Sequence, residues 1–191
     1  LPFLANASVE AAVAAAGRLM QEAGVQAVKI EGGAAVAPII KKLVEIGIPV
    51  MGHLGFTPQS QHQLGLRVQG KDAAGARRLL ADAKAIEEAG VFFMVLELVP
   101  AELAAEVTKR SGVATIGIGA GPHCDGQVQV WHDIFGLAER SPRHARVFAD
   151  IAAAMEAGLK RYLDEVGAGS FPGEAQSSKM DAEVLRQALD D

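Results

Sequence analysis

The sequence repeats one pattern four times, in which an amphipathic stretch reaches a glycine and a short apolar run follows. The glycines are Gly24, Gly47, Gly90 and Gly112, and the apolar runs are residues 25–30, 48–51, 91–96 and 113–118. Glycine takes the left-handed backbone that commonly closes a helix, and short apolar runs are typical of buried parallel strands. The pattern therefore predicts alternating helices and strands, with the glycine ending each helix.

Helices are expected at residues 9–23, 35–46, 72–89 and 101–109. Ser8 is the expected N-cap of the first helix, and Pro38 fits the first turn of the second. The polar, glycine-containing segment 54–66 shows no helical periodicity and is interpreted as a long loop of the kind that often carries function. Such an alternation builds a parallel sheet, either closed as a barrel or doubly wound, and the pattern favours the barrel.

Composition excludes several classes of protein. The chain has 191 residues, 50% of them hydrophobic, and a net charge of −5 without a long basic stretch, so it is expected to be one soluble domain that does not bind nucleic acid. No apolar run approaches the length of a membrane span. The single cysteine, Cys124, excludes an internal disulfide and suits a cytoplasmic location. The chain begins at Leu1 without a methionine, and we interpret this start as a cut.

Each predicted strand runs into a polar or glycine-rich end. These ends carry Glu31, His53, Glu97 and the run Gly117-Ile118-Gly119-Ala120-Gly121. In a barrel of alternating strands and helices, the active site is built at the carboxyl ends of the strands. The glycine run does not match the dinucleotide-binding spacing G-x-G-x-x-G, so we expect it to admit a ligand or a neighbouring strand.

Two charged residues share one strand and one face. Lys29 and Glu31 are two residues apart, so their side chains point the same way. If that face is the barrel interior, the two charges must be paired, bound to a metal or bound to a substrate, because an isolated buried charge is too costly. The alternative is a structural salt bridge between them.

Two other strand ends carry residues suited to proton transfer and hydrogen bonding. Glu97 follows the apolar run 92–96, where partial desolvation would suit a general base, or it is a charge that has already reached solvent before Pro100. His53 lies among glycines that leave room for a ligand, or it is a satisfied core histidine. The remaining histidines are weaker candidates, and among them only His132 is a candidate for a strand end: His62, His123, His132 and His144.

Taken in order, five blocks of sequence resemble the ketopantoate hydroxymethyltransferase family. They are Val28-Lys29-Ile30-Glu31-Gly32-Gly33, Gly52-His53-Leu54-Gly55-Phe56-Thr57-Pro58-Gln59-Ser60, Val95-Leu96-Glu97-Leu98-Val99-Pro100, Ile116 to Gly121 with Asp125-Gly126-Gln127 and His132 to Leu137, and Phe171-Pro172-Gly173-Glu174. The resemblance covers residues 1–174 as part of one barrel domain. It leaves residues 175–191 as a tail, which looks helical from Asp181 to Leu189.

The resemblance implies an α/β fold, a (β/α)₈ TIM barrel of the phosphoenolpyruvate/pyruvate type that assembles as a homodecamer. It implies transfer of a hydroxymethyl group from 5,10-methylenetetrahydrofolate to 3-methyl-2-oxobutanoate through a Mg²⁺-stabilised enolate, in pantothenate and coenzyme A synthesis. By similarity, Glu31 is a metal ligand, Lys29 and His53 bind substrate, and Glu97 is the catalytic proton acceptor. The alternatives are a folate-independent Mg²⁺-dependent lyase or aldolase acting on 2-oxo acids, and a noncatalytic fragment.

The chain departs from the family in one respect. The family's metal site also uses two aspartates, one in a Gly-Asp-Ser motif and one directly before the Leu-Pro-Phe segment. This sequence holds no Gly-Asp-Ser and starts at Leu1. Because a whole barrel takes about 250 residues, we expect roughly 60 or more residues, including the first three strands, to be missing.

Overall fold

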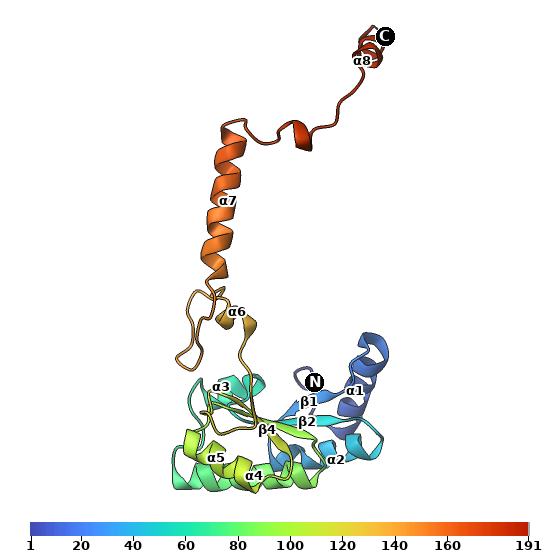
Figure 1. Ribbon diagram of the computed structural model, residues 1–191. Helices are drawn as coiled ribbons and strands as arrows, with labels where there is room; N and C mark the ends of the chain where they lie inside the picture. The colour runs from blue at the N-terminus through green and yellow to red at the C-terminus, as the bar shows by residue number, and fades with distance from the viewer. Residues whose placement is uncertain (191) are drawn as a thin grey trace. The chain divides into compact units, whose positions relative to one another are not determined.

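A computed structural model describes residues 1–190 of the chain. It contains two compact units, Leu1–Gln129 and the residues from Val130 onward. All four predicted strand and helix repeats lie in the first unit (Figure 1). The predicted barrel domain, residues 1–174, spans this unit and part of the second, and its extent stays a prediction.

The first unit alternates helices and strands as the sequence predicts. In chain order its elements are α1 (Val9–Ala23), β1 (Val28–Glu31), η1 (Ala34–Val36), α2 (Ala37–Glu45), β2 (Val50–Gly55), η2 (Pro58–Ser60), α3 (Gln61–Leu64), α4 (Ala73–Glu88), β3 (Phe93–Glu97), α5 (Ala101–Arg110), β4 (Ala114–Ile118) and β5 (Gly126–Gln127). Ser8 caps α1 and Pro38 lies in the first turn of α2, as predicted. The segment expected to lack helix instead contains η2 and α3, which are single turns.

The sheet is parallel throughout, and its strands follow one another in chain order from β1 to β5. A doubly wound sheet reverses its strand order at a switch point, whereas a barrel adds each new strand beside the last. The observed order is therefore that of an arc of a barrel, which confirms the predicted α/β fold class and agrees with part of a TIM barrel.

The strands begin later than the apolar runs suggest. After the left-handed glycines Gly47 and Gly90, the next residue turns its N–H back to the helix that has just ended. Ile48 donates to the carbonyl of Leu43 at 2.9 Å, and Val91 donates to the carbonyl of Ile86 at 3.3 Å. This bond belongs to the Schellman helix ending, so these residues close the helix before the strand can start.

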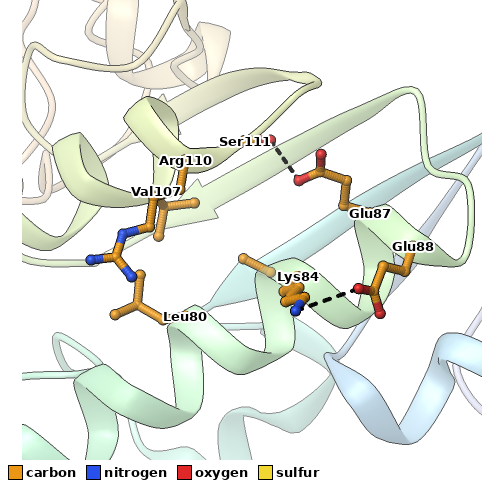
Figure 2. A pocket seen from close by; sticks show the side chains of 8 residues that line it. Leu80, Lys84, Glu87, Glu88, Val107, Arg110 and Ser111 are labelled. Atoms are coloured by element: carbon orange, nitrogen blue, oxygen red, sulfur yellow. Dashed lines mark hydrogen bonds and ion pairs between the residues drawn. The ribbon is translucent and has the colours of Figure 1, made fainter.

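The prediction that a left-handed glycine ends every helix is wrong for Gly112. Helix α5 ends at Ser111, whose backbone is extended, and Gly112 does not adopt a positive φ. The Gly112 N–H instead donates to Glu87 Oε1 at 2.8 Å. Ser111 Oγ donates to Glu87 Oε2 at 3.2 Å, which is the contact drawn in Figure 2. The Glu87 carboxylate, on the neighbouring helix α4, thus accepts two donors at the end of α5, whereas in the other repeats N–H groups turn back to the helix carbonyls.

Alternate strand residues point to opposite faces of the sheet. One face packs against the helices, and its side chains are buried in the core: Val28, Ile30, Val50, Leu54, Met94 and Leu96. Gly52 lets helix α4 come close, because a Cβ there would lie 2.5 Å from Cδ1 of Ile86. The opposite face carries the four predicted site residues: Lys29, Glu31, His53 and Glu97.

The second unit contains α6 (Trp131–Ile134), α7 (Ile151–Gly167), η3 (Glu174–Gln176) and α8 (Ala182–Leu189). Helix α8, capped by Asp181, confirms the helical tail, and Asp191 lies outside the described residues. Helix α7 was not predicted from the sequence, although Ile151 and Met155 begin an apolar repeat of four residues along it. Within residues 1–190, every helix is too short or too polar to cross a membrane.

Candidate active site

Three neighbouring strands bring Glu31, His53 and Glu97 together at their carboxyl ends. The register pairs Glu31 of β1 with His53 of β2, and it pairs Glu97 of β3 with Gly55, two residues beyond His53. His53 Nδ1 lies 3.8 Å from Glu31 Oε1, and His53 Nε2 lies 3.1 Å from Glu97 Oε2. The imidazole therefore stands between two carboxylates, which the sequence predicted only as separate strand ends.

The His53 side chain is buried without a hydrogen bond. The residue is 1% exposed, and neither ring nitrogen has a hydrogen-bond partner among residues 1–190. The contact with Glu97 has the distance of an ion pair without the angles of a hydrogen bond. Buried polar atoms are normally satisfied, and an unsatisfied one is costly. A satisfied core histidine is thus the wrong interpretation, and the ring is suited to meet a ligand or a proton.

Glu31 is held by the loop that follows β2. Its side chain is 12% exposed, and Oε2 accepts the backbone N–H of Gln59 at 2.9 Å. The other oxygen, Oε1, is the one that faces His53. The carboxylate thus has one oxygen tied to a backbone donor and one directed at the imidazole.

Glu97 is the last residue of β3, and its side chain is 15% exposed, so it is not the solvent-exposed loop charge of the alternative interpretation. The residue after it, Leu98, has a φ of 48°, which is rare for a residue with a side chain. Three backbone bonds hold this corner: Phe56 N–H to Glu97 O at 2.8 Å, Gln69 N–H to Leu98 O at 2.8 Å, and Leu98 N–H to Ile118 O at 2.9 Å. Both ends of the 56–69 loop are therefore fastened to the backbone beside Glu97.

Lys29 lies on the same face but one row further from the carboxyl edge, in register with Met51. Lys29 is exposed in the arc of strands that the described residues form, so the condition for a buried ammonium is not met there. Among residues 1–190, no ion pair joins Lys29 to Glu31, so the structural salt bridge is not formed either. The lysine is free to reach toward a bound anion.

Glu31 fits a role as one ligand of Mg²⁺. This ion prefers oxygen donors and is commonly held by one or two carboxylates, with water and substrate oxygens completing the shell. Within the part of the chain that the structure describes, no group of three His, Cys, Asp or Glu side chains could hold a metal. The described residues therefore supply a partial site, in which substrate oxygens would have to take part.

The other sequence candidates lie elsewhere. His62 and His132 are on the short helices α3 and α6, not at strand ends. Gly117 admits the neighbouring segment rather than a ligand, since a Cβ there would lie 3.1 Å from Cys124 Sγ. Asp125 accepts the N–H of Thr115 at 2.8 Å, and the backbone and side chain of Thr115 lower the pKa of this carboxyl. This part of the glycine-rich region is structural.

A cavity of about 490 Å³ lies between α4 and α5 (Figure 2). Leu80 and Val107 contribute apolar walls, and an ion pair of 3.7 Å between Lys84 and Glu88 lies at its side. Ser111, also in its lining, precedes the amino end of β4. The cavity is therefore at the opposite end of the sheet from His53, and barrel enzymes build their active sites at the carboxyl end.

The roles of Gln59 and Gln69, which tie the loop to Glu31 and Leu98, were not predicted from the sequence. Both residues contribute a backbone N–H, and every residue except proline has that donor. No local pattern could have selected them from the other loop residues.

Similarity to known proteins covers nearly all of the chain. The family described as ketopantoate hydroxymethyltransferase matches residues 1–174. The 3-methyl-2-oxobutanoate hydroxymethyltransferase of Gluconacetobacter diazotrophicus is 61% identical over 190 residues, which are 99% of this chain and 69% of the relative. The proteins of the same name from a Roseiflexus species and from Moorella thermoacetica are 58% and 54% identical, over 100% and 94% of this chain and 69% and 68% of their own lengths.

Proposed function

This chain belongs to the ketopantoate hydroxymethyltransferase family, and from this membership we propose that Glu31, His53 and Glu97 bind 3-methyl-2-oxobutanoate and prepare its C3 for hydroxymethyl transfer. The observation that carries the proposal is the buried His53 ring, which stands between two carboxylates without a hydrogen bond. Its place at the carboxyl end of a parallel sheet supports an active site.

Each residue has a role that its surroundings support. Glu97 accepts the proton from C3. It is the last residue of β3, on the sheet face opposite the helices, and its carboxylate is largely shielded from water. The His53 ring holds the substrate by hydrogen bonding, because its nitrogens have no other such partner among residues 1–190. Lys29, exposed on the same face, attracts the negative charge of the oxo acid.

The proposal includes Mg²⁺, with Glu31 as one of its ligands, and 5,10-methylenetetrahydrofolate as the donor of the one-carbon unit. When bound, the ion would supply Lewis-acid polarisation of the 2-oxo group. Glu31 would hold it with the carboxylate that Gln59 orients. A homodecamer and a cytoplasmic location complete the proposal, and both rest on the family resemblance.

The function is tested by product formation in the full-length protein. We expect 2-dehydropantoate to form from 3-methyl-2-oxobutanoate only when 5,10-methylenetetrahydrofolate is present, whereas C3 proton exchange proceeds without the folate. Mass spectrometry of the products and NMR of the oxo acid measure the two events. C3 proton exchange without product formation, even with the folate present, would favour the lyase or aldolase alternative, and the absence of both events would contradict the proposal.

Glu31→Gln is expected to weaken Mg²⁺ binding about 10-fold or more, because a neutral amide replaces a charged oxygen ligand. Calorimetric titration with Mg²⁺ measures the affinity. Glu45→Gln, on the exposed end of α2, is the matched control and should bind Mg²⁺ like the unchanged protein. An unaltered titration of Glu31→Gln would remove this residue from the metal site.

A further inference from the structure

The bond between Gln59 and Glu31 joins a loop to a strand 28 residues earlier in the chain. Gln59 is the second residue of η2, and the first N–H groups of a helix have no partner within it. Threonine is a favoured N-cap, but Thr57 makes no side-chain bond to η2 within the described structure. The Gln59 donor is thus left for Glu31, whose carboxylate takes the place of a local cap.

We propose that Gln59 is a positioning residue for the reaction, because its backbone N–H fixes the Glu31 carboxylate in the orientation that presents Oε1 to the site. The bond is charge-assisted and directional, and its length is 2.9 Å. The bond holds Oε2 in place, and rotation of the carboxylate would break the bond. Oε1 therefore stays on the side of His53. The metal part of this inference rests on the proposed function of Glu31.

The side chain of Gln59 makes a separate contact. Its Nε2 donates to the carbonyl of Leu1 at 2.8 Å. Backbone and side chain therefore act on different partners, and substitution can separate them. Gln59→Ala removes the contact with Leu1 and keeps the N–H, whereas Gln59→Pro removes the N–H as well.

The first experiment measures the bond itself, without metal or substrate. Hydrogen exchange of the Gln59 amide is compared between the unchanged full-length protein and Glu31→Ala, with the Gln69 amide as internal control. Gln69 donates to Leu98 at the other end of the same loop. We expect Gln59 exchange to accelerate about 10-fold or more, the size of a lost hydrogen bond to a charged group, and Gln69 exchange to stay within about 2-fold. Equal exchange of Gln59 in both proteins would overturn the inference, as would equal acceleration of both amides.

The second experiment measures the consequence for the ion. Calorimetric titration with Mg²⁺ should show affinity about 10-fold to 100-fold weaker in Gln59→Pro and unchanged in Gln59→Ala, with both variants melting cooperatively. An affinity for Gln59→Pro equal to that of Gln59→Ala would contradict the positioning role. If the unchanged protein binds no Mg²⁺, the metal role of Glu31 fails, and amide exchange alone decides whether Gln59 holds Glu31. Amide exchange also decides the question if Gln59→Pro does not fold, since proline restricts the preceding residue.

Discussion

Replacing Glu97 with glutamine is expected to slow exchange of the C3 proton of 3-methyl-2-oxobutanoate with solvent deuterium by about 10²-fold to 10⁴-fold, the usual contribution of a general base. Glutamine keeps the size of the side chain but cannot accept the proton. The loss of exchange should be large because Glu97 Oε2 lies 3.1 Å from Nε2 of His53, the ring proposed to hold the substrate. NMR of the oxo acid in deuterium oxide measures the exchange without the folate.

The control for this variant is Glu102→Gln, which makes the same chemical change on the exposed first turn of α5. It should exchange the C3 proton at the rate of the unchanged protein. Mg²⁺ affinity should be nearly the same in Glu97→Gln and in the unchanged protein, because the proposal assigns the metal to Glu31. Exchange by Glu97→Gln at the normal rate would show that another group is the base.

The meeting of Glu31, His53 and Glu97 at one edge of the sheet has a simple physical origin. Parallel strands end at the same edge of a sheet, so residues placed at successive strand ends meet if the register is regular. Glu31, His53 and Glu97 satisfy that condition, with register partners that differ by at most two residues. Helix α1 was likewise predicted with its observed bounds, because Ser8 and Gly24 are local signals.

The features that the sequence could not predict depend on contacts between distant residues. The bond of Gln59 to Glu31 joins residues 28 apart, and that of Gly112 to Glu87 joins residues 25 apart. Both donors are backbone N–H groups, which every residue except proline has, so the local sequence does not indicate that they bond to a distant carboxylate. The exposure of Lys29 is also a tertiary property, because it depends on what covers the sheet face opposite the helices.

Gly55 is the residue at which the smallest substitution is expected to cost the most stability. Its φ is 88°, which side chains rarely allow, and a Cβ would lie 2.2 Å from the carbonyl oxygen of Glu97. That oxygen accepts the Phe56 N–H at 2.8 Å, so the backbone would have to move at a bond beside Glu97. Gly55→Ala should lose about 1–2 kcal/mol from backbone strain and about 1 kcal/mol or more from the displaced bond.

Gly24→Ala separates these two contributions. Gly24 closes α1 with a left-handed backbone, at a φ of 66° and a ψ of 21°, and a Cβ there would meet no atom within 4 Å. It should show the strain alone, about 1–2 kcal/mol, whereas Gly55→Ala should lower the melting temperature by several degrees more, given about 2–4 °C per kcal/mol at this size. Calorimetric melting of both variants measures the difference in stability. C3 proton exchange should fall in Gly55→Ala alone, because only that substitution displaces the backbone of Glu97. Equal melting of the two variants would mean that the close approach of β2 to β3 does not hold Glu97 in place.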